Sequence, residues 1–376
     1  MMKSSFTGAF NLELSGQSHD EFFTITMDGV QAGIKIDLAL IERDLTKRKP
    51  RLSFNTKRCE HDAYEISGGL IKKDDYYLTD GKNIKIKFFN HDIKTHDYDI
   101  LKDFDRPGHV DYVARLKYPA HALAGGGHFS GRLTAGLVFM GALVKQIIRT
   151  KITDFDILTH ISKCLGIEDD TYYSKDLTTN YQSYLTAYYD HDILMFDKDK
   201  YQLLLRKMKS VEYNFGGQLE TIIINVPSLL GATWFNSLEA KIAQFIFSIP
   251  ALKGIVFGAY LDYDEQHNYE QIQGYQEQPA KLITKHNYDG GINGGISTGE
   301  AIVFTTFLKP IATQNKEILT YSKSQKKLAP LRMAGRHDQS IINRLIPIIN
   351  AGACLAIYDE LLQANYFNIK KAPTKD

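Results

Sequence analysis

The stretch that most constrains this 376-residue chain runs from residue 106 to residue 134. It begins with Arg106-Pro-Gly-His109-Val-Asp-Tyr and closes with Gly125-Gly-Gly-His-Phe-Ser-Gly-Arg132-Leu-Thr. Glycine lets the main chain come close to a ligand, and the first N–H groups of a helix attract anions. A histidine in a Pro-Gly turn, followed by a triple glycine and a helix start, therefore predicts a ligand site built largely from main chain.

An apolar helix is predicted directly after this stretch. Apolar residues recur there at a helical period, at Leu133, Leu137, Met140, Val144 and Ile147. Gly136 and Gly141 stand among them as small positions, so we expect this helix to pack closely against another helix.

The rest of the pattern is mixed. Phe23, Ile25 and Met27 alternate with polar residues, which predicts a half-buried strand, and Asp37 is a plausible N-cap for a helix that stops before Pro50. Further strands are expected at 63–70, 83–89, 220–226, 254–260 and 302–308. Further helices are expected around 203–208, from a capping box at 236–239 to Pro250, and after residue 338, where Pro347 should kink or divide the helix.

Two segments lack a core pattern. Residues 167–200 are rich in Asp, Tyr, Thr and Lys, which favours a variable surface excursion rather than core. Residues 261–279 are polar and long, which is typical of a mobile loop that closes over a site. No linker or repeat divides the chain, so residues 1–376 are expected to form one domain.

Composition excludes several function classes. With 43% apolar residues and a net charge of +1, the chain lacks the basic footprint of a nucleic-acid binder. Its three cysteines, Cys59, Cys164 and Cys354, are far apart, which argues against disulfides and against a Cys-based metal site. No secretory leader and no run of 18 apolar residues is apparent, so we expect a cytoplasmic protein without membrane spans.

Some local features allow two interpretations. The cations Lys47, Arg48, Lys49 and Arg51 follow a predicted helix, where they could lie solvated at its negative end or bind an anion. The glycines at 125–127 and 290–295 could be plain flexible loops. Together with Ser130, Arg132, Lys309 and Arg336, they could instead hold a flat phosphorylated cofactor.

Among twelve histidines, His19 and His109 stand out because both lie in turns from which a side chain can reach a cleft. Neither has the spacing of a metal site, so acid–base chemistry is preferred to metal binding.

In their order along the chain, these segments resemble motifs of the chorismate synthase family. The matching stretches are Gly16-Gln-Ser-His19, Met27-Asp-Gly-Val, Asp44-Leu-Thr-Lys-Arg48-Lys-Pro50, Asn90-His-Asp92, Asp97-Tyr98, Arg106-Pro-Gly-His109, Gly125–Thr134, Gly290–Gly299 and Gly335-Arg-His-Asp338. An ordered set of this kind is far more specific than any one motif, and it spans nearly the whole chain.

The resemblance implies a fold and a reaction. The fold is an α+β sandwich in which helices pack between antiparallel β-sheets, assembled as a homotetramer. The reaction is the 1,4-anti elimination of phosphate from 5-enolpyruvylshikimate-3-phosphate to give chorismate, with reduced FMN (FMNH2) as cofactor. The flavin would be reduced by a separate flavin reductase or an NADPH-dependent reductant; a built-in NADPH:flavin reductase is less favoured because no extra domain is evident.

The resemblance also assigns roles by motif position. His19 would protonate the departing phosphate, His109 would protonate or stabilise the reduced flavin, and Asp338 would keep the flavin N5 able to take the C6 proton. Substrate would be bound by Arg48, Lys49, Arg51 and Arg132. The flavin would be bound by His128, Phe129, Ser130, Ala251, Gly294, Lys309, Pro310, Ile311, Ala312, Thr313 and Arg336.

Some motif positions depart from the family pattern. Ile311 and Ala312 replace hydroxyl residues, His128 stands where arginine is usual, and Phe54 stands where the family tends to have a substrate-binding arginine. These departures keep a second hypothesis open, namely a non-catalytic relative that binds flavin or a phosphoanion and has kept the fold.

Overall fold

The alternation at Phe23, Ile25 and Met27 produces β3 (Phe22–Met27), the central strand of an antiparallel sheet in which all three side chains are buried. The computed structural model describes residues 2–56, 61–91, 100–118, 124–174, 177–260, 275–278, 281–314, 316–333 and 337–368. The five strands of this first sheet are, in spatial order, β1 (Lys3–Thr7), β2 (Asn11–Gly16), β3, β8 (Ile84–Phe89) and β5 (Tyr64–Gly68).

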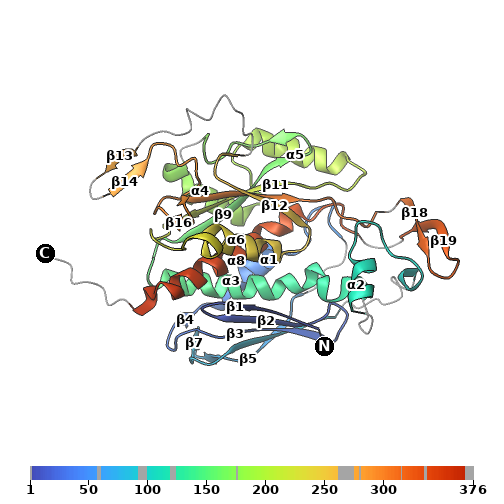
Figure 1. The fold of residues 1–376 in the computed structure, drawn as a ribbon, viewed down its shortest axis with the longest axis horizontal. Coiled ribbons are helices and arrows are strands. Elements are labelled where there is room, and N and C mark those ends of the chain that lie inside the picture. The colour runs from blue at the N-terminus through green and yellow to red at the C-terminus, as the bar shows by residue number, and fades with distance from the viewer. Residues whose placement is uncertain are drawn as a thin grey trace.

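A second antiparallel sheet lies on the other side of a helical layer (Figure 1). Its strands are, in spatial order, β10 (Ile167–Glu168), β9 (Asp156–Cys164), β11 (Gly217–Ile224), β17 (Ile302–Leu308) and β12 (Leu252–Phe257). Both faces of β9 are buried, since eight of its nine residues are buried. A strand covered on both sides has no need of polar residues at alternate positions, and β17, with the sequence Ile-Val-Phe-Thr-Thr-Phe-Leu, shows no such alternation.

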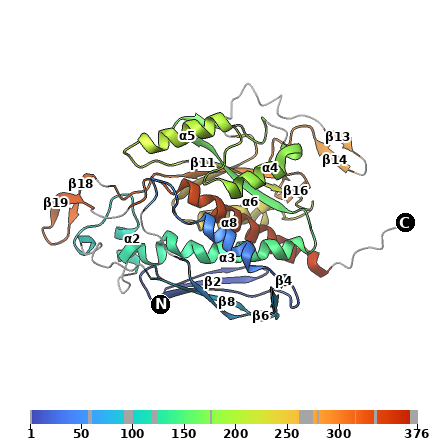
Figure 2. The same cartoon turned by 180° about the vertical axis from the view of Figure 1, so that it is seen from behind.

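The helical layer consists of α1 (Leu38–Lys47), α3 (Thr134–Arg149), α6 (Leu238–Phe247) and α8 (Ile342–Gln363) (Figures 1 and 2). The Asp37 carboxylate accepts from Ala39 N at 2.8 Å, which confirms the predicted N-cap of α1. The expected α+β sandwich with helices between antiparallel sheets is therefore confirmed.

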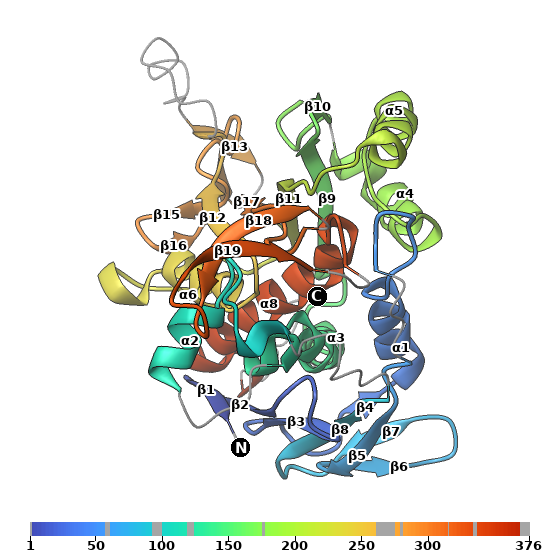
Figure 3. The same cartoon turned by 90° about the vertical axis from the view of Figure 1, so that its right-hand side faces the viewer.

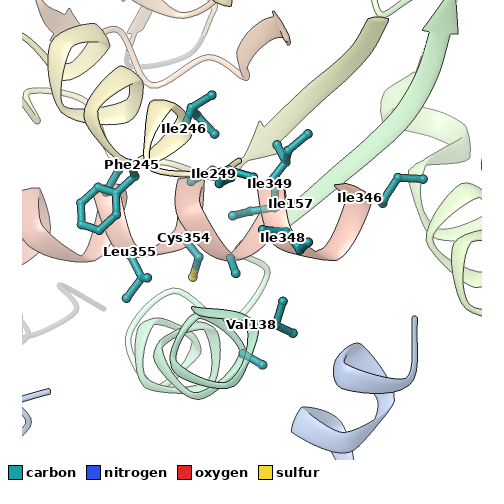
Figure 4. Packing of buried hydrophobic residues seen from close by; sticks show 14 of the residues in the cluster. Val138, Ile157, Phe245, Ile246, Ile249, Ile346, Ile348, Ile349, Cys354 and Leu355 are labelled. Atoms are coloured by element: carbon teal, nitrogen blue, oxygen red, sulfur yellow. The ribbon is translucent and has the colours of Figure 1, made fainter. Parts of the chain in front are cut away.

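The two glycines of α3 explain its place between a sheet and a helix. A Cβ on Gly136 would lie 3.1 Å from Ile25 in the first sheet, and one on Gly141 would overlap the Cα of Ala351 in α8. The predicted close helix packing is thus confirmed at Gly141. Figure 4 shows the apolar core around this crossing, with side chains from α3, α6, α8 and β9 in contact.

Some expected elements differ in the structure. Pro347 lies inside α8, but the helix continues to Gln363 without division. A proline in the second turn removes one N–H bond, which the long buried helix outweighs. At α6 the N-cap is Ser237, whose Oγ accepts from Ala240 N at 3.1 Å, so the capping box predicted from Asn236 is wrong by one residue.

Residues 167–200 are not confined to the surface. They contain α4 (Leu177–Asp190), and α5 (Lys198–Ser210) begins within them, both on the outer side of the second sheet (Figures 1 and 2). Four consecutive buried residues, Ile193 to Phe196, join the main core. The expectation of a non-core excursion was wrong because the polar composition of the segment masks a short apolar run, Ile193 to Phe196, and two tyrosines, Tyr181 and Tyr188, that are buried in the core.

The predicted mobile loop 261–279 lies mostly outside the described residues. Within it, β13 (Tyr275–Gln278) pairs with β14 (Lys281–Thr284), so this part is a hairpin strand. Smaller sheets are β4 (Lys35–Ile36) with β7 (Tyr77–Thr79) and β6 (Leu70–Lys72), and β15 (Ile292–Asn293) with β16 (Ile296–Ser297).

The hairpin β18 (Glu317–Ser322) and β19 (Lys327–Arg332) lies beside α2 (Asp111–Lys117) at one end of the molecule (Figures 1 and 3). Thr320 donates to the main-chain oxygen of Asp105 at 2.8 Å, which ties the hairpin to the chain that leads into α2.

Two described helical stretches, Gly131–Arg149 and Ile342–Gln363, have the length and mean hydropathy of a membrane span. In this structure 78% and 89% of their apolar windows are buried against the rest of the chain, as in the central helices of a layered protein.

Candidate active site

The candidate site begins where the turn after β2 meets the glycine stretch before α3. Ser18 N donates to Gly127 O at 3.2 Å, and the Ser18 hydroxyl lies 3.0 Å from Nδ1 of His19. The structure therefore brings the His19 turn against residues 126–128, two segments that are far apart in the sequence.

The buried side chain of His128 connects this junction to β1 and β2. Its Nδ1 lies 2.6 Å from Gly16 O and its Nε2 lies 2.8 Å from the Ser4 hydroxyl. Because a carbonyl can only accept, Nδ1 carries the proton, and in the neutral ring Nε2 accepts from Ser4. Both nitrogens of the buried imidazole are thus used within the protein, so only the main chain of His128 is available to a ligand.

His109 is held by an acid two residues further on. Its Nδ1 lies 2.6 Å from Asp111 Oδ1 and 3.0 Å from Arg106 Nη2. A guanidinium only donates, so the shorter contact decides that Nδ1–H donates to Asp111. Burial alone would raise the pKa of Asp111, but hydrogen bonds from Arg106 and His109 hold that pKa well below its ordinary value. The ring is thereby oriented, and its Nε2 has no hydrogen bond to any described residue.

Residues 309–313 lie against this histidine turn. Lys309 Nζ donates to Gly108 O at 2.6 Å, and the Thr313 hydroxyl accepts from Arg106 Nη1 at 3.1 Å. Asn214 Nδ2 donates to the main-chain oxygens of Ile311 and Thr313, both at 2.8 Å, and so fixes the segment around Pro310 and Ala312.

Ala251 belongs to the same region. Lys309 N donates to Ala251 O at 3.1 Å, and Ala251 has a φ of +73°, a left-handed conformation that is uncommon for alanine. The structure thus brings together Ala251, the 309–313 segment and His109.

The glycine stretch leaves room beside His109. Gly126 has a φ of +87°, and a Cβ there would lie 3.7 Å from Ser130 Cβ and 4.0 Å from His109 Cε1. Ser130 caps the short turn that follows by accepting from Arg132 N at 3.2 Å, and Phe129 is 36% exposed. Glycine main chain, an exposed ring and nearby Lys309 and Arg106 suit a flat ligand that carries a phosphate.

A buried ion cluster connects two of the predicted substrate residues. Arg48 Nη2 donates to both oxygens of Asp62, at 2.6 and 2.8 Å, and Arg132 Nη1 contacts the same carboxylate. Arg48 Nε is buried and has no hydrogen-bond partner among the described residues. Sequence alone left open whether Arg48 is solvated; it is 3% exposed.

Asp338 is joined to this cluster through Arg344. Its Oδ1 accepts from Thr56 N at 2.9 Å, and Arg344 Nη1 lies 3.1 Å from its Oδ2. Arg344 Nε in turn donates to Arg48 O at 3.0 Å. Phe54, two residues before Thr56, packs in the core with its ring centroid 5.4 Å from that of Phe215.

Some predicted site residues lie elsewhere. Lys49 Nζ donates to His61 O at 3.2 Å and lines, together with Asp62, a cavity of about 750 Å³ between α1 and β5 to β7. Arg51 is exposed, with its Nη1 3.6 Å from Asp192. Arg336 lies outside the described residues.

Gly294 is not brought to the other predicted flavin residues. It lies between β15 and β16, beyond the Ile302 end of β17, whereas Lys309 follows the Leu308 end. The seven residues of this extended strand span roughly 20 Å. Figure 1 shows β16 and α2 at opposite ends of the molecule.

Sequence reasoning missed Asp62, Asn214 and Arg344, which connect distant segments and have no local signal, and it gave no role to Asn90, although Asn90 begins one of the matching stretches. Arg106 and Asp111 could have been found, because both stand in the same Pro-Gly turn motif as His109. Among the described residues, no group of three His, Cys, Asp or Glu side chains is arranged to hold a metal ion.

Comparison with known proteins gives one consistent result. The family model described as "Chorismate synthase" matches residues 10–362. The chain is 34% identical over 367 residues to the chorismate synthase of Prochlorococcus marinus (strain AS9601), covering 96% of this chain and 97% of that protein. It is 30% identical over 372 residues to that of Methanococcoides burtonii, covering 98% of each.

A solved structure titled "Crystal Structure of Chorismate Synthase" has the same fold. It matches with a TM-score of 0.69 at 20% identity and covers 94% of this chain and 92% of its own.

Proposed function

The chain belongs to the chorismate synthase family, and from that premise we propose which of its residues carry the reaction. The chain is a carbon–oxygen lyase that eliminates phosphate from 5-enolpyruvylshikimate-3-phosphate to give chorismate, the last step of the shikimate pathway. The small-molecule substrate carries a phosphate and two carboxylates, so its site needs fixed cations.

One observation carries the location of that site. The buried Arg48 guanidinium keeps its Nε without a partner among the described residues, and the hydrogen-bonded cluster around it leads to the His19 turn. A buried donor left without an acceptor costs about 1–3 kcal/mol, which a ligand oxygen would recover. Arg48 therefore binds the substrate phosphate.

His19 is the proton donor to the departing phosphate. Its turn is held to the glycine stretch by Ser18 and through Asn90 to Arg132, so the imidazole has a fixed position beside the cationic cluster. A positioned general acid contributes typically 10²- to 10⁴-fold.

The cofactor is reduced FMN, and its site is the space bounded by His109, Gly126 to Ser130, Ala251 and the 309–313 segment. When bound, the flavin supplies a transient electron to the eliminating substrate. Lys309 meets the flavin phosphate, and Arg106 holds Thr313 and Asp111 in place beside it. Asp111 aligns His109 through Nδ1, which leaves Nε2 to face the flavin ring; Nε2 donates a hydrogen bond when the imidazole is protonated.

Asp338 is an anionic group at the other side of the site. Thr56 N and Arg344 fix its carboxylate, which supports the role assigned by the resemblance, that of keeping the flavin N5 able to take the C6 proton. Arg336 and Lys49 remain proposed ligands on the family resemblance alone.

The active assembly is a cytoplasmic homotetramer that receives reduced flavin from a separate reductase. Gly294 supports the assembly, because it lies too far from its own Lys309 to share one flavin with it. Beside Gly295 lies an exposed apolar segment, with Leu229, Trp234 and Phe235 exposed by 79%, 85% and 94%. A second copy covers this segment and receives Gly294 at its own flavin.

Anaerobic turnover with dithionite-reduced FMN tests the function. We expect chorismate to form at a rate that depends on the flavin being reduced. No chorismate from a preparation that still binds FMN would favour the non-catalytic relative. Bleaching of bound flavin by NADPH alone would show that the chain carries its own reductase.

A further inference from the structure

Asp62 is a buried carboxylate with an unusual main-chain conformation. Its side chain is 2% exposed, and its φ is +53°, in the left-handed region that residues other than glycine rarely adopt. Asn and Asp tolerate this region best, so a backbone held there points to a specific task for the side chain.

The carboxylate joins two guanidiniums from distant segments. Arg48 follows α1 and Arg132 precedes α3, and both donate to Asp62. Burial alone would raise the pKa of Asp62, but the charges of Arg48 and then Arg132 outweigh burial and hold the pKa below its ordinary value. The group is therefore a carboxylate, and the three side chains together retain one positive charge.

Arg132 extends the cluster to the general acid. Its Nε donates to Asn90 Oδ1 at 3.0 Å and its Nη2 donates to Phe89 O at 2.9 Å. Asn90 Nδ2 donates to Gln17 O at 3.2 Å and Asp20 O at 2.8 Å, on either side of His19. Each nitrogen of Arg132 thus has a protein acceptor, so this residue connects groups within the site.

We propose that Asp62 is a positioning residue, which holds the Arg48 guanidinium in place for the substrate phosphate and fixes it relative to the His19 turn. The inference rests on the proposed function for the identity of that phosphate. It assigns phosphate contact to Arg48 and a connecting role to Arg132.

For the variant Asp62→Asn, the change in charge and the loss of Arg48 positioning predict opposite effects on phosphate binding. The substitution raises the local charge from +1 to +2, so attraction alone would strengthen anion binding. Loss of position would weaken it, because the new amide N–H groups face guanidinium donors and release Arg48 from its orientation. Asn keeps the left-handed backbone accessible, and Asp62→Gly does so too, which provides a second variant compatible with the fold.

The chain offers a matched control in Asp156. This carboxylate is also buried, pairs with Arg149 at 2.6 Å and with Lys145, and lies at the opposite end of α3. Asp156→Asn removes a buried charge of the same kind away from the site, so it reports the cost that is purely structural.

The experiment measures binding of inorganic phosphate by calorimetry, KM and kcat for 5-enolpyruvylshikimate-3-phosphate, and the melting temperature. Asp62→Asn and Asp62→Gly should raise the phosphate Kd and the KM at least tenfold, while Asp156→Asn lowers the melting temperature comparably and changes both constants less than twofold. Unchanged or tighter phosphate binding in both Asp62 variants would overturn the inference. A wild type that makes no chorismate would instead refute the proposed function, and the phosphate measurement would still decide the role of Asp62.

Discussion

Asp62 and Asp156 are buried carboxylates that each hold two cations, at opposite ends of α3. The helix has 16 residues, so the two clusters are about 24 Å apart. At Asp156 the partners Lys145 and Arg149 come from the last turns of that helix, and Arg149 Nε also donates to Phe155 O at 2.8 Å. At Asp62 the partners come from two distant segments, and Arg48 Nε is left without a partner among the described residues.

The difference separates closed clusters from open ones. A closed cluster, such as that of Asp156, takes its cations from neighbouring turns of one helix and contributes to folding. An open cluster leaves a polar nitrogen without a partner among the described residues, as Arg48 Nε and His109 Nε2 are, and this nitrogen can serve a ligand. Substitutions in open clusters should therefore change activity, and substitutions in closed clusters should change stability.

The largest expected effect is in the open cluster around His109. His109→Ala should lower kcat by about 10²- to 10⁴-fold, the usual contribution of a positioned acid or base. FMN binding, measured by fluorescence titration, should be retained, because the glycine stretch and Lys309 are unchanged. His191→Ala, at an exposed histidine outside the site, is the control; equal turnover in both variants would refute the role of His109.

A closed cluster around His160 should behave in the opposite way. This fully buried ring lies 3.0 Å from Asp169 and 2.9 Å from Glu220. Burial would lower the pKa of His160, but hydrogen bonds to the two carboxylates raise it from 6.5 to about 9.

The raised pKa fixes the sign of the pH dependence. The protonated ring stabilises the folded state fully below about pH 6.5, and this contribution is lost as the pH rises through about 9. His160→Gln should cost about 3 kcal/mol in the free energy of unfolding at neutral pH and flatten its pH profile between about 7 and 10. Urea unfolding at several pH values across that range measures the free energy of unfolding. The kcat of the variant should change less than twofold.

Arg48→Lys sharpens the comparison within the open cluster. Lysine keeps a positive charge beside Asp62 but has no donor at the Nε position. Losing one charged hydrogen bond to phosphate costs about 1.5–3 kcal/mol, so KM should rise roughly ten- to a hundredfold. Steady-state kinetics under anaerobic conditions measure this KM. An unchanged KM would mean that Arg48 does not contact the substrate.

The smallest effect is expected at Arg51. This side chain is exposed and its pair with Asp192 is long, at 3.6 Å, so the contact is worth about 0–1 kcal/mol. Arg51→Ala should leave KM within threefold of the wild type in the same assay. A larger rise would return Arg51 to the substrate site where the sequence first put it.

Local patterns predicted most of the fold. The alternation of β3 and the N-cap Asp37 depend on neighbours in the sequence, and each was found in the structure. The expectation that residues 167–200 lie outside the core was wrong, because Tyr181 and Tyr188 bury their rings without forming an aliphatic period.

Only the site residues that lie within the matching motifs could be predicted from the sequence. His19, His109 and Asp338 stand in ordered stretches, and Asp111 lies in the same turn motif as His109. By contrast, Asn90 and Arg344 join the site through contacts across the fold, to Asp20 and to Arg48. His128 is the clearest correction, since its substitution suggested a cation near the flavin phosphate. In the structure it bonds Gly16 and Ser4 instead.

The contact between Gly141 and Ala351 has an evolutionary consequence. No side chain fits at that crossing, so the residues from Thr134 to Met140 cannot change in number without turning the helix by about 100° per residue. Such a turn would carry Arg132 away from Asp62 or Gly141 away from α8. Insertions and deletions in this protein should therefore accumulate outside α3. The number of residues in the first two turns of α3 sets the distance and the angle between the core crossing and the substrate cations.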